Sequence, residues 1–307
     1  MSTKIITKDN YKNTSQTIGL SFFSSLIGGI TTDQSLMNIP IDDHLVQRGD
    51  GVFEAMRVIN KKAYHLTEHL LRLSFSASQI GLDLKYSLTE IENIIQDCIN
   101  QAGLQTAMIR LFLSRGRGSF SVSPYSTTGS QLYIVVTPLT LPEQKMYDDG
   151  AKVYLSEILP KLSPFANIKS CNYLPNVMMK KEAIDNQSEF SLSFDTDGFL
   201  TEGATENVLI LTQDLKLITP SYKKTLKGTT LNIVLKLAKS LKLKDVSYQN
   251  ITKQDLLKAK AVMLCSTILE VLPVSEIKDK EKKITKLKDF SVAKDLRILL
   301  QKDMKIL

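Results

Sequence analysis

The sequence predicts a mixed α/β (α+β) fold in two domains, on three observations. Stretches with the 3.6-residue period of amphipathic helices occur in both halves of the 307-residue chain. Short runs rich in valine, isoleucine and aromatic residues lie between them, as strands of a mixed fold would. The stretch TPLTLPEQKMYDDG, with its prolines and glycine, separates the halves. We therefore expect a small N-terminal domain at 1–140, with a tail at 1–18, a linker at 141–150 and a larger domain at 151–307.

The first half contains two predicted helices followed by two predicted strands. The stretch TEHLLRLSFSASQIG carries apolar residues on one helical face, with Thr67 as the expected N-cap. The stretch SLTEIENIIQDCINQAG opens with a capping box of Ser87 and Glu90 and ends in Gly103. The runs AMIRLFLS and QLYIVVT are predicted strands, joined by the loop RGRGSFSVSPYSTTGS.

The second half alternates between the two kinds of element. Its predicted strands are AKVYLSE, FSLSFD, NVLILT, DVSYQN and KAVMLC. Helices are expected from about Tyr173, over TTLNIVLKLAKSLKL, and from Thr252. Mixed elements in both halves are typical of two α/β or α+β domains.

Composition and charge exclude several classes of protein. The net charge of +7 comes from 39 basic and 32 acidic residues that are interleaved along the chain, so we expect no nucleic-acid partner. The cysteines and histidines are too scattered for a disulfide framework or a metal site; they are Cys98, Cys171, Cys265, His44, His65 and His69. This cysteine usage fits a reducing compartment, and we expect a cytoplasmic protein.

The N-terminal region gives no membrane signal. The apolar stretch IGLSFFSSLIGGI is too short for a spanning helix and is broken by serines and glycines. The basic, Ser- and Thr-rich residues 1–18 fit a short targeting segment or a plain tail, and we expect the tail.

A lysine and a carboxylate are the first candidates for chemistry. Lys169 stands just ahead of the predicted helix NYLPNVMMKKEA, where it is either a solvated charge or an amine held in a pocket. Glu202 follows a predicted turn and stands beside Gly203, whose missing side chain would let a planar ligand approach closely. Alternatively, Glu202 is an ordinary charge on the surface.

Three other segments match the needs of a phosphate group. Thr229 and Thr230 stand at a predicted helix N-terminus, where free N–H groups and the helix dipole attract anions. Ser266 and Thr267 end a strand with adjacent hydroxyls, and Arg72 offers a bidentate guanidinium. Each segment alone fits an ordinary cap, turn or solvated charge. Together with a lysine and an isolated carboxylate, they match pyridoxal 5'-phosphate, which needs a Schiff-base amine and a partner for its ring nitrogen.

The motifs HLLRL, IKSCNYLPNVMMKKEA, TEGATENVLI, LKGTT and CSTILEVLPV stand in an order that resembles the class IV, fold-type IV pyridoxal-phosphate enzymes. This family includes branched-chain aminotransferases, D-amino-acid aminotransferases and aminodeoxychorismate lyases. The resemblance runs from about residue 20 to beyond residue 277. It implies a small N-terminal α/β domain, a larger C-terminal α/β pseudo-barrel domain, a cofactor between them and a homodimer.

The resemblance also implies roles for single residues. Lys169 would be the Schiff-base lysine, Glu202 the partner of the pyridine nitrogen, and Tyr173 a contact of the cofactor's phenolic oxygen. His69 shares a motif with the phosphate arginine and is expected to be structural. The phosphate group would be held by Arg72, Thr229, Thr230, Ser266 and Thr267.

The branch of the family is suggested by the spacing KSCN, which lacks the double glycine usual in branched-chain aminotransferases. It looks like the D-amino-acid aminotransferase and lyase branch. Phe53 and Glu54, in GDGVFE, are expected at the pocket wall, and Phe53 stands where many aminotransferases have tyrosine. Arg115 and Arg117 would bind a substrate carboxylate, in this or a neighbouring subunit, or would be solvated loop charges.

Two activities follow from the resemblance. The first is transfer of an amino group between an amino acid, D-amino or branched-chain, and a 2-oxo acid. The alternative is a 4-amino-4-deoxychorismate lyase that forms 4-aminobenzoate and pyruvate in folate synthesis. Both would use Lys169 as the general acid and base.

Overall fold

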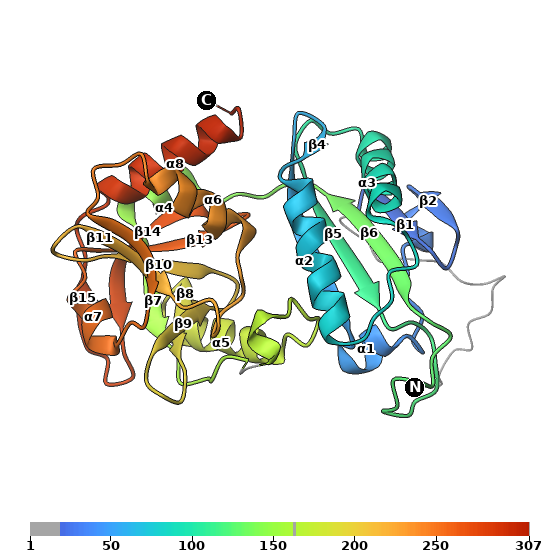
Figure 1. Ribbon diagram of the computed structural model, residues 1–307, viewed down its shortest axis with the longest axis horizontal. Helices are drawn as coiled ribbons and strands as arrows, with labels where there is room; N and C mark the ends of the chain where they lie inside the picture. Colours follow the sequence, from blue (N-terminus) through green and yellow to red (C-terminus); the bar gives the residue numbers. More distant parts are fainter. Residues whose placement is uncertain (1–18, 162–163, 307) are drawn as a thin grey trace, which may run out of the picture.

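The computed structural model describes residues 19–161 and 164–306, and the chain forms two sheets that lie side by side (Figure 1). The first sheet has the order β2-β1-β6-β5-β3-β4, and all of its strands pair antiparallel. Its strands are β1 Ser21–Ser24, β2 Gly29–Thr31, β3 Gly51–Ile59, β4 Lys62–Ala63, β5 Ala107–Ser114 and β6 Gln131–Thr137. Three α-helices accompany it: α1 His44–Arg48, α2 Leu66–Gln79 and α3 Leu88–Ala102.

Helices α2 and α3 cover one face of this sheet, as Figure 1 shows. Their apolar residues recur at helical spacing, so Leu70 and Leu73 of α2 and Ile91 and Ile95 of α3 are fully buried in one core with the sheet. The predicted capping box is confirmed, because Ser87 and Glu90 each bond the other's backbone N–H.

The predicted start of α2 was wrong. The helix begins at Leu66, one residue before Thr67, and its N-cap is His65 in the left-handed conformation with no side-chain cap. The cause is the short connection from β4. The N–H of Tyr64 donates to the carbonyl of Arg57, which holds the chain against β3 until the helix begins.

The second sheet has nine strands in the order β12-β11-β10-β13-β14-β7-β8-β9, with β15 paired to β14. The pairs β14–β7, β7–β8 and β11–β12 are parallel, and the others are antiparallel. Its strands are β7 Ala151–Leu155, β8 Phe190–Phe194, β9 Leu200–Gly203, β10 Asn207–Leu211, β11 Lys216–Pro220, β12 Asp245–Gln249, β13 Ala261–Ser266, β14 Glu270–Lys278 and β15 Ile284–Lys286. Its helices are α4 Gln144–Asp149, α5 Leu174–Asp185, α6 Thr229–Ala238, α7 Lys253–Leu257 and α8 Ser291–Asp303.

Alternating apolar residues of this sheet feed two separate cores. Val208 and Ile210 of β10 belong to one core, and Leu209 and Leu211 belong to the other, which α6 and α8 cover. The mixed α/β fold class is therefore confirmed. The segment expected to be a linker contains α4, and the boundaries of the domains stay a prediction.

Two sets of contacts tie the halves together. Arg57 of β3 forms a buried ion pair of 2.5 Å with Glu270 of β14, which also accepts from Arg297 of α8. The N–H of Phe53 donates to the carbonyl of Lys169, so the segment around this lysine lies along β3. Within residues 19–161 and 164–306, no helix is long and apolar enough to cross a membrane.

Candidate active site

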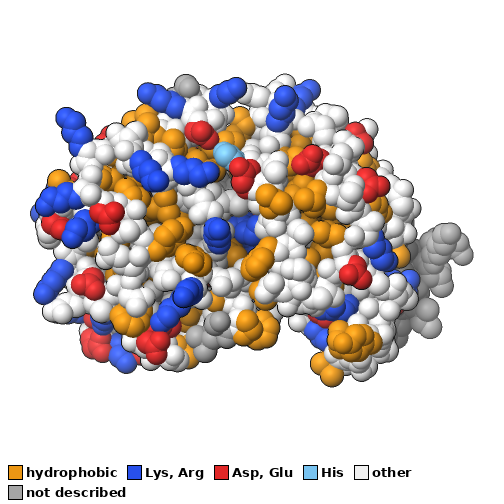
Figure 2. Space-filling model, viewed as in Figure 1, with side chains coloured by type: hydrophobic (Ala, Val, Ile, Leu, Met, Phe, Trp, Pro, Cys, Tyr) orange, Lys and Arg blue, Asp and Glu red, His pale blue; other side chains and the backbone are white. Residues whose placement is uncertain are grey.

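A cavity of about 240 Å³ opens between the two sheets. Basic side chains gather near the middle of the face shown in Figure 2, where the halves meet and hydrophobic side chains flank them. An adjoining recess contains Glu202 and shares Lys169 and Tyr173 with the cavity. The cavity brings together eight of the residues predicted from the sequence: Phe53, Arg72, Lys169, Tyr173, Thr229, Thr230, Ser266 and Thr267.

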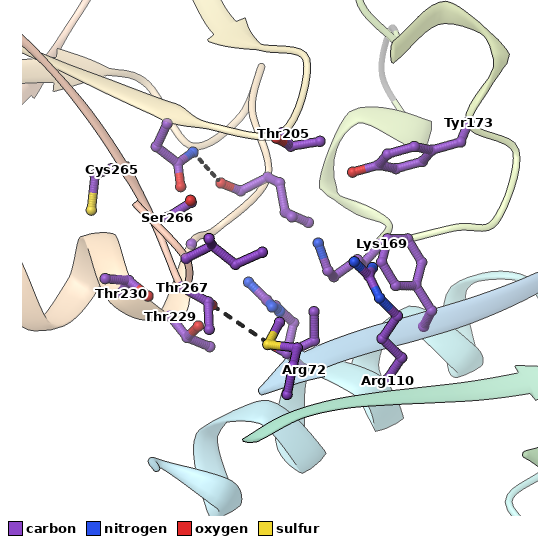
Figure 3. A pocket seen from close by; sticks show the side chains of 17 residues that line it. Arg72, Arg110, Lys169, Tyr173, Thr205, Thr229, Thr230, Cys265, Ser266 and Thr267 are labelled. Atoms are coloured by element: carbon purple, nitrogen blue, oxygen red, sulfur yellow. Dashed lines mark hydrogen bonds between the residues drawn. The ribbon is translucent and has the colours of Figure 1, made fainter. Parts of the chain in front are cut away.

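Lys169 is held by its backbone and points into the cavity (Figure 3). Its carbonyl accepts from the N–H of Phe53 at 2.9 Å, and its own N–H donates to the Ser76 hydroxyl at 3.2 Å. Its Nζ lies 4.5 Å from the centre of the Phe53 ring. Burial, reinforced by the nearby guanidinium of Arg72, lowers the pKa of Lys169 to about 8. Close to neutral pH, a useful fraction of this amine is therefore unprotonated and nucleophilic.

The N-terminus of α6 forms one end of the cavity. Gly228 is the N-cap and offers no side chain to the first-turn N–H groups, which leaves them available to an anion. A Cβ at Gly228 would lie 2.0 Å from Oδ1 of Asn207, so a larger residue here would displace the Asn207 side chain. The hydroxyl-bearing residues Thr229 and Thr230 follow it and line the cavity, while Thr267 closes it from the end of β13.

Arg72 is fixed at the same end by a buried carboxylate. It donates to Glu54 twice, at 2.8 and 2.7 Å, and to the carbonyl of Lys227 at 3.0 Å. His69 contacts the same carboxylate through Nδ1 at 2.6 Å and the Thr229 hydroxyl through Nε2 at 3.3 Å. Burial opposes ionisation of Glu54, but Arg72 and His69 outweigh it and hold its pKa at about 2. The residue expected to be structural, His69, thus connects the arginine's carboxylate to a threonine of the anion site.

Glu202 lies at the opposite side of the site, near the end of β9. Its Oε2 accepts from the N–H of Leu226 at 3.0 Å and from the amide of Asn207 at 3.4 Å. Burial raises the pKa of Glu202 to about 7, although the Leu226 N–H, Lys161 and Lys169 favour the ionised form. Gly203 serves a different purpose from the one expected, because its missing side chain makes room for Glu206, whose Oε2 would lie 2.5 Å from a Cβ there.

Two aromatic residues form the wall beside the lysine. The rings of Phe53 and Tyr173 meet edge to face with centroids 5.3 Å apart. The phenol of Tyr173 finds no hydrogen-bond partner among the described residues, and burial raises its pKa. A half-buried phenol without a partner is available to a ligand oxygen.

Arg110 is a site residue that the sequence reasoning missed. It lies on β5 opposite Ala55 of β3, lines the cavity and points into it (Figure 3). Within the described residues it forms no ion pair. Its signal in the sequence was a charge in the middle of the strand AMIRLFLS, two residues after Met108, which lines the cavity from the same face.

Arg115 and Arg117 lie outside this chain's cavity. Arg115 pairs with Asp50 at 2.8 Å and also donates to the carbonyls of Ile80 and Gly81. Arg117 pairs with Asp42 at 2.9 Å on the surface. The prediction that Arg115 or Arg117 binds a substrate carboxylate in its own subunit is therefore wrong, because each is paired with an aspartate away from the cavity.

The residues present fit pyridoxal phosphate. The uncapped start of α6, Arg72 and the threonines offer donors for a phosphate group. Lys169 offers an amine for an aldehyde, and Tyr173 offers a free phenol. Glu202 has no ion-pair partner within the described residues, so it can accept a charge from a protonated ring nitrogen.

Known proteins resemble this chain over most of its length. The family model of amino-transferase class IV matches residues 51–277. A protein named D-amino-acid transaminase, chloroplastic, from Arabidopsis thaliana is 35% identical over 93% of this chain and 77% of its own. A D-alanine aminotransferase from Bacillus licheniformis is 30% identical over 82% of this chain and 87% of its own.

Solved structures share the fold. The branched-chain aminotransferase of the thermophilic archaeon Thermoproteus uzoniensis, solved with norvaline, superposes with a TM-score of 0.82, at 20% identity, over 94% of this chain and 95% of its own. The branched-chain amino acid aminotransferase of Escherichia coli gives 0.81, at 21% identity, over 94% of both chains. Another branched-chain amino acid aminotransferase of this fold was solved with pyridoxamine 5'-phosphate. The chain therefore belongs to the class IV aminotransferases, and it is a pyridoxal-phosphate enzyme that moves an amino group between an amino acid and a 2-oxo acid.

Proposed function

We propose that the amino donor is a D-amino acid and that the acceptor is a small 2-oxo acid. The two relatives described above, at 35% and 30% identity, carry names for D-amino-acid and D-alanine transamination. The single structural observation behind an amino-acid substrate is Arg110, a guanidinium without an ion-pair partner in the described residues that points into the same cavity as Lys169. A carboxylate is the natural partner of such a group.

Lys169 performs the proton transfers in this proposal. Bound pyridoxal phosphate supplies an aldehyde that captures the amino group and a ring that accepts electrons when the Cα proton leaves. The Nζ of Lys169 would hold this proton between its removal from Cα and its return to the carbon that the cofactor's aldehyde group supplies, so that the amino group stays with the cofactor and the substrate leaves as a 2-oxo acid. Its pKa of about 8 is close to ordinary working pH, which suits a group that must act as both base and acid.

The other residues position the reacting groups. Glu202 keeps the ring nitrogen protonated, while Arg72, Thr229, Thr230, Thr267 and, more weakly, Ser266 hold the phosphate. The hydroxyl of Ser266 already accepts from the N–H of Leu269 at 3.2 Å, so its first role is to stabilise the turn between β13 and β14. Phe53 packs beside Lys169 and helps exclude water from the amine.

The lyase alternative is kept because of one fold neighbour. A structure from Legionella pneumophila, described as a proposed 4-amino-4-deoxychorismate lyase, superposes with a TM-score of 0.78, at 23% identity, over 88% of this chain and 97% of its own. At this identity it supports the fold, and the two relatives with higher identity favour transamination.

The test is an amine screen of the pure holoenzyme with L- and D-amino acids. We expect loss of the cofactor's visible band with D-amino acids and formation of an equal amount of 2-oxo acid. Preference for L-amino acids would contradict the proposed handedness. Inertness toward every amino acid, with 4-aminobenzoate formed from aminodeoxychorismate, would establish the lyase instead.

We also propose that the chain acts as a homodimer in which the loop between β5 and β6 serves the neighbouring subunit. Phe120, Val122 and Tyr125 of this loop are 73%, 84% and 94% exposed, an unusual display of large apolar side chains. Arg115 and Arg117 begin the same loop, so they would reach a partner's site if the loop docks there. Light scattering of the full chain should give a dimer mass, and Tyr125→Ser with Phe120→Ser should weaken it.

The division into domains at 1–140 and 151–307 and a cytoplasmic location stay predictions. The relative from Arabidopsis is named chloroplastic, so the compartment is best tested by imaging a tagged chain in cells.

A further inference from the structure

A second lysine lies in the recess that contains Glu202. Lys161 stands in the loop between β7 and α5, and its side chain is half-buried. It lines the same recess as Lys169, Tyr173, Glu202 and Glu206. Nothing in the sequence marked this residue, because it stands in a loop without a recognisable motif.

The surroundings of Lys161 set it apart from a surface lysine. Its Nζ lies 3.5 Å from the hydroxyl of Ser170 and 5.4 Å from the centre of the Tyr173 ring. Within the described residues no carboxylate lies within ion-pair distance of it, whereas surface lysines such as Lys181 pair directly with an acid. Burial lowers the pKa of Lys161, and the charge of Glu202 is the main influence that opposes this.

The ionised form of Glu202 depends on the groups around it. The groups that favour its ionised form are the N–H of Leu226, Lys161 and Lys169, and Glu206 opposes it. The nitrogen of Lys169 is the atom committed to the cofactor's aldehyde, so its charge is not reserved for Glu202. Lys161 lines the same recess as Glu202, and its nitrogen is not committed to the cofactor's aldehyde.

We propose that Lys161 is a positioning residue that keeps the Glu202 carboxylate ionised, so that this carboxylate holds the cofactor's ring nitrogen in its protonated form. The inference rests on the proposed role of Glu202 but not on the identity of the amino acid. Lys161 acts through space across the recess and leaves the carboxylate oxygens free for the ring.

The experiment compares four holoenzymes: wild type, Lys161→Met, Lys161→Arg and Lys181→Met. Lys161→Met removes the charge and keeps the stem, Lys161→Arg keeps a charge, and Lys181→Met removes an exposed lysine that pairs with Asp185. The readout is the absorbance of the bound cofactor between pH 5.5 and 9, with kcat and KM measured alongside.

We expect the acid-side midpoint of the absorbance titration to rise by about one pH unit in Lys161→Met, the size typical of a lost neighbouring charge. At pH values below both midpoints, kcat should fall by up to about tenfold, which corresponds to one pKa unit, while KM changes little. Lys161→Arg and Lys181→Met should titrate like the wild type.

A titration of Lys161→Met that matches the wild type would overturn the inference. So would an equal shift in Lys161→Arg, because that would show a loop anchored by shape rather than by charge. Should Lys161→Met fold poorly, Lys161→Gln is measured instead, and a Glu202→Gln background must abolish the effect of either substitution. A wild type that takes up no pyridoxal phosphate would overturn the proposed function itself, an outcome distinct from these.

Discussion

The two ends of the site hold their carboxylates in opposite ways. One end, formed by the N-terminus of α6 and Arg72, is the anion end. Here Glu54 is fully buried but is neutralised by Arg72 and His69, and its pKa falls to about 2. At the ring-nitrogen end, Glu202 has a backbone N–H and an amide but no ion pair within the described residues, and its pKa rises to about 7.

This difference separates a fixed charge from an adjustable one. The paired carboxylate is part of a scaffold that orients Arg72 and Thr229 before any ligand arrives, which lowers the cost of binding a phosphate. The unpaired carboxylate is incomplete until a protonated ring nitrogen supplies its counter-charge. We therefore expect substitutions at the anion end to affect cofactor retention, and those at the ring end to affect turnover.

Lys169→Ala should have the largest effect on turnover, because it removes the amine that performs the proton transfers. We expect turnover to fall by at least the roughly 10²–10⁴-fold typical of a lost acid–base group. Steady-state assays measure this, with Lys181→Ala as the exposed control. Undiminished turnover in Lys169→Ala would contradict the mechanism.

Arg72→Met tests the fixed end. It leaves His69 as the remaining partner of the buried Glu54, and breaking a buried ion pair typically costs about 3–5 kcal/mol, so both the free energy of unfolding and the affinity for pyridoxal phosphate should drop. Urea unfolding and equilibrium dialysis measure these quantities. Arg72→Lys should recover only part of the loss, because a single ammonium cannot repeat the two-point contact.

Glu202→Gln tests the adjustable end. The substitution keeps the shape of the side chain, so cofactor content should remain near that of the wild type. Turnover should fall by about 10²–10³-fold, the scale of a lost electrostatic contact to the reacting system. Loss of cofactor together with activity would mean that this end also serves retention.

The pH dependence of stability should differ in sign between the two carboxylates. Glu54 has a lowered pKa, so its contribution to folding is complete above the ordinary value of 4.5 and is lost as the pH falls toward about 2. Glu202 has a raised pKa, so its contribution is complete below 4.5 and is lost as the pH rises to about 7. Relative to Glu202→Gln, the cofactor-free wild type should therefore lose stability between these pH values, as urea unfolding can measure.

Arg117→Ala should have the smallest effect on stability. Its ion pair with Asp42 is exposed, and solvent screening leaves such a pair with little effect on the free energy of unfolding. Thermal unfolding measures this. A clear rise in KM in the same variant would support a role for the residue in a neighbouring subunit's site.

The sequence predicted the parts of the site that belong to continuous motifs. Lys169 precedes a helix, Thr229 and Thr230 begin one, and Glu202 lies near the end of a strand; the combination and order of these motifs along the chain, rather than any one of them, made these residues candidates. The fold class was predictable because hydrophobic periodicity is local.

Other features depend on contacts between distant segments. Arg110 is revealed only by the pairing of β5 with β3, which turns its side chain toward the cavity. Lys161 is revealed only by the folded chain, which places its Nζ 5.4 Å from the centre of the Tyr173 ring. The start of α2 was misplaced because a bond between Tyr64 and Arg57, rather than a capping side chain, decides where the helix begins.

The hydrogen bonds between Lys169 and β3 have a consequence for biosynthesis. The carbonyl of Lys169 accepts from Phe53, and the N–H of Cys171 donates to the carbonyl of Gly51, so the lysine's segment docks on a strand translated more than a hundred residues earlier. Chains fold as they emerge from the ribosome, with N-terminal parts first. A nascent chain can thus place the Lys169 amine on the first sheet before α6 has been translated. It can bind the cofactor only later, when the N-terminus of α6 completes the phosphate site.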